Sequence, residues 1–254
     1  MLPAHQLSVR LERFQVWWIR LTVRERGTTR RVDSTQVKAV LSGEITSMYT
    51  SSEEGAGLLL AMMEPSPTLE QEFQSWYDSE HFPEREGTEG FLTATRLVCV
   101  DGWPRYLALY DLENVGVLRG SGYAKIAGEN YSRWTHRIIP HVWGHYRAEG
   151  VQVAPGRSLF GANGRASRVA LWRFHDVPRR LEPAIRDGLE SMYGGRAETA
   201  QIRLFRCNET TRTDYVGIVE LYVPYVPGAE IVESLGEARK HIDLVNIYTR
   251  YFRI

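Results

Sequence analysis

The sequence predicts an α+β fold in which two ferredoxin-like β-α-β-β-α-β units occur in one chain and pack sheet to sheet. Three observations predict it. The same order of strand and helix patterns occurs twice, and the first two strands begin at similar separations, Gly57 to Gly90 in one unit and Arg168 to Thr199 in the other. Each four-stranded sheet would also leave an apolar face bare. Two such faces cover each other when the sheets close into a barrel.

Apolar runs, helical periodicity and turn signals place the elements of the first unit. Residues 57–63 are an uninterrupted apolar run typical of a buried strand, and Asp101-Gly102-Trp103-Pro104 is typical of a turn between two strands. The elements expected in this unit are strand 57–63, helix 69–82, strands 91–100 and 105–112, helix 115–127 and strand 138–147.

The second unit repeats this order with a different sequence. Gly194 and Gly195 are typical of a helix end, whereas Gly236 interrupts the pattern of the second helix. The elements expected in this unit are strand 169–174, helix 179–193, strands 199–207 and 215–223, helix 228–240 and strand 244–252.

These patterns divide the chain into four parts. Residues 56–149 form the first unit and residues 168–254 the second. Residues 150–167 carry four glycines and one proline with little periodicity, which is typical of a linker that runs over the surface. Residues 1–55 match neither unit. We expect this leader to be poorly packed, either because it extends the reading frame upstream of a true start at Met48 or because it is an accessory element on the core.

The composition excludes several classes of function. The chain of 254 residues carries 31 basic and 31 acidic residues, so it has no net positive charge with which to hold nucleic acid. Apolar runs such as residues 58–63 are far shorter than the roughly 18 residues of a membrane-spanning helix, and charged residues interrupt any signal peptide. With only Cys99 and Cys207, we expect reduced thiols, a cytoplasmic protein and no membrane partner.

Residues 76–85 carry the most chemistry in the chain, with the sequence Trp-Tyr-Asp-Ser-Glu-His-Phe-Pro-Glu-Arg. Thr68 and Gln71 have the spacing of a capping box, so we expect a helix to begin at Thr68. Pro83 disfavours helical angles at the residue before it, so we expect this helix to end near His81.

Helical spacing brings the polar members of this stretch together. Trp76, Tyr77 and Glu80 fall on the stripe that faces the sheet, so Glu80 is the charged member of an apolar face. Tyr77 lies four residues and Asp78 three residues before His81, close enough for side-chain contact. The last helical turn and the Asp78 carboxylate both favour the His81 cation, and this histidine can give and take protons near pH 7.

Two interpretations of the stretch are open. In the functional one, His81 is the proton donor or acceptor, Tyr77 and Asp78 orient it, and Arg85 holds a carboxylate or phenolate without any cofactor. In the structural one, the same side chains only cap the helix and tie it to the next loop, with Arg85 in a surface salt bridge.

The pattern Trp76-Tyr77-x-x-Glu80-His81-x-Pro83-x-Arg85, followed by Gly90-Phe91, resembles the signature of EthD-like proteins in the dimeric α/β-barrel superfamily. The resemblance covers residues 57–149. The second unit resembles the superfamily only in element order, because residues 190–193 read Glu-Ser-Met-Tyr where the motif would be expected. The resemblance implies a ferredoxin-like barrel with one pocket per chain, between helix and sheet. It also implies relatives that include cofactor-free decarboxylases, cyclases, isomerases and monooxygenases, some haem-binding members, and others without an assigned activity.

Further candidates lie near the fourth strand. His141 and His145 suggest a metal site, but four residues along a strand span about 13 Å, so the two cannot share an ion and we expect no metal. Alternation places His141 and Trp143 on one strand face, and either face could line a cavity. A loop plugged by Trp134 is the competing interpretation of the segment before the strand. The candidates for ligand binding in this region are Asn130, Trp134, His141 and Trp143.

The leading hypothesis is a cofactor-independent enzyme of the lyase, decarboxylase or isomerase type, acting by acid/base catalysis on a small aromatic or polyketide-like molecule, as in aromatic compound catabolism. Its pocket would add Trp76, Glu80 and Arg85 as substrate-binding residues. Two alternatives stay open: a non-catalytic protein that binds a small hydrophobic ligand for an oxidative pathway, and a haem-binding barrel. A small-molecule partner is expected, and formation of a homodimer is left open.

Overall fold

The structure is a computed structural model of the 254-residue chain. It describes residues 55–208, 213–228 and 232–252 with their side chains. The chain divides into two compact units, Met1–Ser52 and Glu53–Ile254. In the first unit only the backbone of three short strands is described, so the expectation of a poorly packed leader or a mis-assigned start falls mostly outside the described residues.

The three described strands of the first unit form an antiparallel sheet in the order β1-β2-β3. They are β1 (Ser8–Glu12), β2 (Arg20–Glu25) and β3 (Thr28–Arg31). In the register of this sheet Ser8 lies opposite Arg24, and Thr22 lies opposite Arg31.

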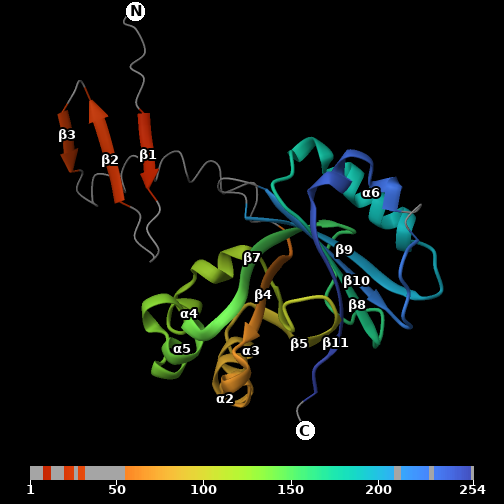
Figure 1. The fold of residues 1–254 in the computed structure, drawn as a ribbon, viewed down its shortest axis with the longest axis horizontal. Coiled ribbons are helices and arrows are strands. Elements are labelled where there is room, and N and C mark those ends of the chain that lie inside the picture. The colour runs from red at the N-terminus through yellow and green to blue at the C-terminus, as the bar shows by residue number, and fades with distance from the viewer. Residues whose placement is uncertain are drawn as a thin grey trace, which may run out of the picture. The chain divides into compact units, whose positions relative to one another are not determined.

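The second unit contains a closed barrel of antiparallel strands in the order β10-β8-β11-β5-β6-β4-β7-β9 (Figure 1). Its strands are β4 (Gly57–Pro65), β5 (Phe91–Asp101), β6 (Tyr106–Leu112), β7 (Val142–Ala154), β8 (Arg168–Phe174), β9 (Thr199–Cys207), β10 (Asp214–Leu221) and β11 (Ile242–Arg250). The strands expected from the sequence are therefore present, with β7 beginning later and running further than predicted.

The barrel consists of two sheets with the same order of strands. The first half is ordered β5-β6-β4-β7 and the second half β9-β10-β8-β11, and pairs β7 with β9 and β5 with β11 join them. Within each half, the first strand of the half lies between its third and fourth strands, which is the ferredoxin-like arrangement. The predicted fold class is confirmed, because the two sheets close on each other around one interior.

Helices of the two halves lie on different sides of the barrel (Figure 1). The first half carries η1 (Pro67–Leu69), α2 (Glu70–Trp76), η2 (Tyr77–His81), α3 (Phe82–Glu86), η3 (Val115–Arg119), α4 (Ser121–Ala124), η4 (Gly128–Asn130), α5 (Arg133–Ile138) and η5 (Ile139–His141). The second half carries η6 (Arg179–Leu181), α6 (Glu182–Tyr193) and η7 (Glu233–His241).

Two of the predicted helices are wrong in form. A single helix over 115–127 is replaced by short segments, because Gly120 between η3 and α4 has the extended angles φ −72° and ψ 157°. In the second half, η7 is a 3-10 helix with a kink at Gly236, whose φ of 54° lies in the left-handed region that favours glycine. The predicted helix 179–193 is confirmed as η6 followed by α6.

Strand β4 separates two cores, and all nine of its residues are buried. Leu58 and Leu60 belong to the core inside the barrel, which also takes Phe205 from β9. Leu59 and Ala61 point to the other side and join the core between the sheet and the helices of the first half. Burial on both faces explains why the sequence of β4 is an uninterrupted apolar run.

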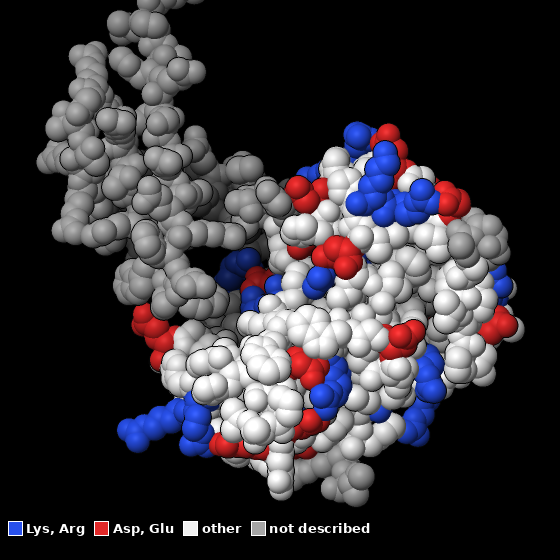
Figure 2. Space-filling view, viewed as in Figure 1, with Lys and Arg blue, Asp and Glu red and all other residues white. Residues whose placement is uncertain are grey.

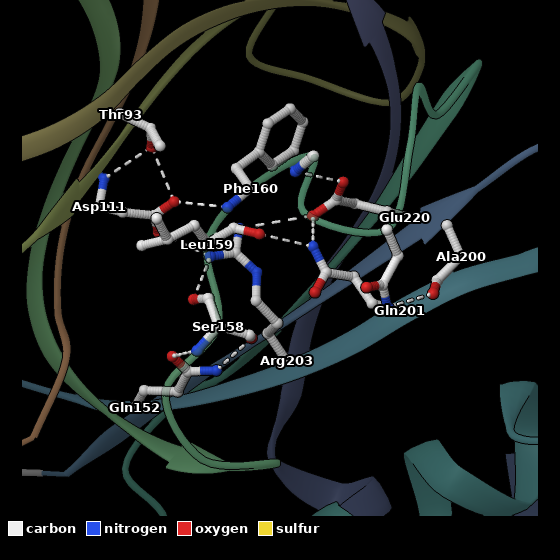
Figure 3. Close-up of polar contacts among 12 residues, drawn as sticks. Thr93, Asp111, Gln152, Ser158, Leu159, Phe160, Ala200, Gln201, Arg203 and Glu220 are labelled. Atoms are coloured by element: carbon white, nitrogen blue, oxygen red, sulfur yellow. Dashed lines mark hydrogen bonds and ion pairs between the residues drawn. The ribbon is translucent and has the colours of Figure 1, made fainter.

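The segment after β7 enters the barrel (Figure 3). Phe160 is 8% exposed, and its backbone N–H donates to Asp111 of β6 at 2.6 Å. The N–H of Gly161 donates to Glu220 of β10 at 2.9 Å. The expected path of the linker over the surface is therefore wrong for residues 158–161, because buried carboxylates on two strands accept its backbone hydrogen bonds.

No helix in the described part of the chain has the length and apolarity needed to cross a bilayer. On the face drawn in Figure 2, basic and acidic side chains are interspersed rather than gathered by sign. Mixed charge of this kind does not favour non-specific binding of a phosphate backbone.

Candidate functional site

The helical stretch that carries the motif is continuous from Pro67 to Glu86. Its central turn, η2, is a π-helix in which the N–H of Phe82 bonds to the carbonyl of Tyr77. The predicted end at His81 is wrong, because the π-turn η2 precedes Pro83 and the helical path continues through it to Glu86. The predicted capping box is also wrong, since no side chain caps the start of α2.

His81 lies inside an aromatic cluster on the buried side of η2. The side chain is 5% exposed, and its ring centre lies 4.2 Å from that of Trp76 and 5.1 Å from that of Tyr77. Nδ1 of the imidazole has no hydrogen-bond partner among the described residues. Tyr77 is therefore a ring neighbour of His81, as its spacing predicts.

The His81 imidazole is held in its neutral form. Burial is the main cause that lowers the pKa of His81 well below its usual value, and the positive charges of Arg85 and Arg96 lower it further, with a contribution from His145. The expectation that the helix end and Asp78 favour the cation is wrong, because desolvation and nearby guanidinium groups outweigh both.

Asp78 points away from His81 and binds Arg96 of β5. Nη1 of Arg96 donates to the Asp78 carboxylate, and Nη2 donates to Gln74 at 2.6 Å. The guanidinium carbon lies 4.2 Å from the ring centre of Tyr77 and 4.1 Å from that of Tyr251. Arg96 thus lies against two aromatic rings and forms an ion pair, and Asp78 bonds to this guanidinium rather than to the imidazole that it was expected to orient.

Glu80 ties the motif helix to α5. Its carboxylate accepts hydrogen bonds from the hydroxyl of Ser132 and, at 3.4 Å, from that of Thr135. The same Thr135 oxygen accepts a 3.0 Å hydrogen bond from Nε1 of Trp76. The Glu80 carboxylate lies on an otherwise apolar face because it accepts hydrogen bonds from these two hydroxyl groups.

Arg85 is buried at 3% exposed and bonds to the backbone of its own helix. Nη1 donates to the carbonyl of His81 at 3.1 Å and approaches Glu84 at 3.5 Å, and Nη2 reaches the carbonyl of Ile126 at 3.5 Å. The ring centre of Tyr123 lies 6.0 Å from the guanidinium carbon. These contacts correspond to the structural interpretation of Arg85, but in a buried position rather than in a surface salt bridge.

A second buried tyrosine faces the same cluster. Burial raises the pKa of Tyr110 well above its usual value, and the neighbouring Tyr77 raises it further. The Tyr110 hydroxyl makes no contact that meets hydrogen-bond geometry within the described residues. The cluster therefore holds two buried polar atoms, His81 Nδ1 and this hydroxyl, without a satisfactory partner in the described part of the chain.

Two adjoining grooves lie on the other side of η2. The first, of about 280 Å³, lies between Phe82, residues 94–96 of β5 and residues 250–252, with Asp78 at its edge. The second, of about 380 Å³, lies along residues 71–79 and shares Asp78, Tyr251 and Phe252 with the first. Arg96 lines the first groove and lies against the Tyr77 ring, which in turn contacts the imidazole, so both side chains separate this groove from His81.

Only Asp78 of the candidate residues lines these grooves. The second groove is lined mostly by the helix itself, whereas the first takes most of its residues from β5 and residues 250–252, which no local motif connects with the helix. Arg96 had a detectable signal, a lone arginine in an otherwise uncharged strand pattern over residues 91–100. Tyr251 and Phe252 had no such signal in the sequence, since aromatic residues near a strand end are common.

The candidates near β7 lie apart from both grooves. Asn130 is exposed and donates to the carbonyl of Ala124 at 2.8 Å, and Trp134 donates from Nε1 to Glu72 at 3.2 Å. His141 is exposed in η5, before the strand begins, and Trp143 is 58% exposed. Trp134 packs against the core of the first half, in line with its interpretation as a plug.

The fold is shared with proteins of known structure. An anthrone oxidase-like protein matches with a TM-score of 0.53 and 13% identity, over 79% of this chain and 92% of that chain. A mutant chlorite dismutase from Candidatus Nitrospira defluvii has a TM-score of 0.47 and 10% identity, over 80% and 94% of the two chains. A heme-binding protein from Thermus thermophilus has a TM-score of 0.45 and 12% identity, over 78% and 92%.

The structure defines a mixed α+β protein with a closed antiparallel barrel whose two halves each have the ferredoxin-like order of strands, and the first of these matches shares this fold. No family model and no curated protein matches the chain. The likeness is one of fold, and the narrower resemblance to EthD-like proteins stays a prediction from the motif.

The side chains at these sites do not fit a haem group. Haem iron is held by histidine, cysteine, methionine or tyrosine. The two grooves are lined by no histidine, cysteine or methionine from the described residues, and their one phenol, Tyr251, contacts Arg96 and donates to Asp78 at 3.4 Å. His81 is covered by the rings of Trp76 and Tyr77. Among the described residues no group of three or more His, Cys, Asp or Glu side chains could hold a metal ion.

Proposed function

We propose that this protein is a small-molecule enzyme that works by acid/base catalysis at His81, of the lyase, decarboxylase or isomerase type. One observation carries the proposal: a buried, neutral imidazole, whose Nδ1 is unpartnered among the described residues, lies in an aromatic cluster whose Tyr77 ring contacts Arg96, a residue of the first groove. A neutral imidazole is the form that accepts a proton, and a buried unpaired nitrogen is costly unless it serves a purpose.

The proposed chemistry needs this histidine, a carbon acid and a movement of the Tyr77 ring that covers the imidazole. Nδ1 of His81 accepts a proton from the carbon next to a substrate carbonyl, and the electron pair of that C–H bond passes into the carbonyl as an enolate. In an isomerisation the imidazolium returns the proton to a different carbon. In a decarboxylation Nδ1 accepts the proton of the substrate's carboxylic acid group, the C–C bond to that group breaks as CO₂ leaves, and its electron pair passes into the neighbouring carbonyl as an enolate. The imidazolium then returns the proton to carbon and becomes neutral again.

The aromatic surroundings support a flat, mostly apolar substrate. Trp76 and Tyr77 pack against the histidine, Tyr110 neighbours Tyr77, and Tyr110 keeps its proton because burial raises its pKa. A protonated phenol can donate a hydrogen bond to a developing enolate oxygen. These features favour an aromatic or polyketide-like substrate, as the resemblance to EthD-like proteins implies.

Turnover of a substrate panel tests the proposal. Aromatic β-keto acids and phenolic acids are offered to the purified full chain, with CO₂ release and ultraviolet absorbance followed over time. We expect His81→Gln to lower the rate on an accepted substrate by about 100-fold to 10,000-fold, the usual contribution of a general acid or base. The matched control is His136→Gln, since His136 is exposed on α5. Equal rates for wild type and His81→Gln, with both proteins folded, would contradict the proposal.

The second candidate is a protein that binds a small molecule without converting it. The observation that favours it is that both grooves are lined by Asp78 and neither by His81, with Arg96 and Tyr77 between the first groove and the imidazole. It predicts saturable binding of a panel compound with no product, and binding that His81→Gln leaves unchanged.

A further inference from the structure

Tyr77 contacts both the imidazole of His81 and the guanidinium of Arg96. Its ring centre lies 5.1 Å from that of His81 and 4.2 Å from the guanidinium carbon. Tyr77 and His81 are the first and last residues of the π-turn η2, a kind of turn that is frequent at functional sites. Both side chains are buried, so the position of this ring decides whether solvent or a ligand reaches the imidazole from this side.

Arg96 is itself held by several contacts. Its guanidinium carbon lies 4.1 Å from the ring centre of Tyr251, and the guanidinium donates to Asp78 and, at 2.6 Å, to Gln74. A cation over an aromatic ring is attracted by the negative face of the ring, and more strongly where water is excluded. The Arg96 guanidinium and the rings of Tyr77 and Tyr251 are named here the Arg96 stack.

Tyr251 comes from the second half of the barrel. It follows β11, whose last residue, Arg250, lies opposite Leu97 of β5. The N–H of Tyr251 donates to the carbonyl of Arg96 at 2.9 Å, and its hydroxyl donates to Asp78 at 3.4 Å. The half of the chain that lacks the motif therefore places an aromatic ring beside the motif helix.

We propose that Arg96 and Tyr251 are positioning residues for His81: the Arg96 stack holds the Tyr77 ring against the imidazole and closes the way from the first groove to Nδ1. The inference rests on the proposed function, because it concerns access to the same histidine. It also gives the second half of the chain a part in the site of the first half.

The lining of the first groove supports this arrangement. Asp78, Arg96 and Tyr251 line the groove, whereas Tyr77 and His81 are not among its lining residues. A ligand in the groove therefore meets the outer members of the Arg96 stack before it can reach the imidazole.

Position and charge have to be separated in the test. Burial is the main cause that lowers the pKa of His81, and the positive charges of Arg85 and then Arg96 lower it further. Replacement of Arg96 removes a charge as well as a contact and leaves the Asp78 carboxylate without its ion pair. Replacement of Tyr251 removes one ring from the Arg96 stack and leaves that ion pair in place.

The reaction of His81 with diethylpyrocarbonate, which modifies an accessible neutral imidazole, tests the inference. The full chain is labelled near neutral pH, and modified peptides are quantified by mass spectrometry with His136, exposed on α5, as the internal reference. We expect Tyr251→Leu to raise the relative rate at His81 by about tenfold, since loss of one desolvated contact between a cation and a ring changes an opening equilibrium by about this factor. Tyr251→Phe keeps the ring and should react like the wild type.

Phe252→Leu is the matched control. Phe252 is the next residue and lines the same groove, but its ring lies against Arg165, 5.1 Å from that guanidinium carbon. Its His81 rate should equal that of the wild type. The thiol of Cys207, buried in the barrel core, reports opening of the whole fold, and its reaction with a thiol reagent should be the same in all variants.

Arg96→Met should raise the His81 rate at least as much as Tyr251→Leu does. If Arg96→Met does not fold, the variants at position 251 still decide. Equal His81 rates for the wild type and Tyr251→Leu would overturn the inference, and so would a rise of the same size in Phe252→Leu.

The outcomes also separate this inference from the proposed function, because the labelling needs no substrate. A His81 rate that depends on the ring at position 251, with turnover indifferent to His81→Gln, would remove the function and leave the inference. Turnover that depends on His81, with no effect of Tyr251→Leu on the labelling, would remove the inference and leave the function.

Discussion

Nη1 of Arg203 donates a 2.6 Å hydrogen bond to the carboxylate of Asp111, and neither side chain is more than 4% exposed (Figure 3). Arg203 lies on β9 and Asp111 on β6, so the pair joins the two halves of the barrel through its interior. Glu220 of β10 lies 3.7 Å from the same guanidinium. A buried pair of this kind contributes little over an apolar replacement, but breaking it leaves a charge without a partner.

Asp111→Asn should therefore destabilise the barrel by about 3 kcal/mol, near the lower end for a broken buried pair because Glu220 remains. The double variant Asp111→Leu/Arg203→Met should cost less than the single one, since no charge is left alone. Urea unfolding followed by circular dichroism measures both. A cost below about 1 kcal/mol for Asp111→Asn would show that the ion pair adds little to the strand pairing that joins the halves.

The stability of the protein should fall as the pH is lowered below about 6.5. His81 has a lowered pKa in the folded chain, so between that pKa and the ordinary value the unfolded state binds more protons than the folded state. The free energy of unfolding therefore rises with pH in this window, and the contribution of His81 is fully present above it.

His81→Gln should remove that contribution. Between pH 7.5 and pH 5.5 the unfolding free energy of the wild type should drop by about 1 kcal/mol more than that of the variant. Urea unfolding at the two pH values measures the difference, and His136→Gln serves as the control because His136 is exposed. An equal drop for wild type and His81→Gln would contradict a neutral buried imidazole.

Freshly purified protein should show no Soret absorbance, and added hemin should not produce the spectrum of a histidine-ligated haem. The reason is the donor set: the described residues of the grooves offer no histidine, cysteine or methionine, and rings cover His81. Ultraviolet and visible spectroscopy on the full chain checks this. A Soret band that disappears in His81→Gln would show that the site opens to haem.

The strands could be predicted from the sequence because their signals are local. The apolar run of β4, the turn before β6 and the spacing of β8 and β9 each reside in a few adjacent residues. The helix over 179–193 was equally clear, since Gly194 follows its last residue. In these strands and this helix the local sequence pattern favours the same structure as the overall fold, which is usual for elements that serve to pack the core.

The end of the motif helix could not be predicted, because a π-turn lies outside the ordinary rules. Pro83 is an unfavourable residue inside an α-helix, but one extra residue in the preceding turn moves it to a tolerated position.

The groove could not be predicted either, because its residues are far apart in the chain. Asp78 pairs with Arg96, eighteen positions later, and its other oxygen accepts a hydrogen bond from the hydroxyl of Tyr251, 173 positions later. Spacing within a helix predicts which neighbours a side chain could reach, and for Asp78 it suggested His81. The guanidinium on the adjacent strand is a stronger partner for a carboxylate than a buried neutral imidazole.

The protonation state of His81 across pH tests the proposed role of this residue most directly. Ring carbon and nitrogen resonances of the histidines are recorded by NMR on the full chain. The signal that is absent from the spectrum of His81→Gln is assigned to His81. We expect the imidazole of His81 to stay neutral at pH 6.5 and to gain a proton only well below that value. Half protonation at pH 6.5 or above would mean that the histidine is a solvated cation and not the base proposed here.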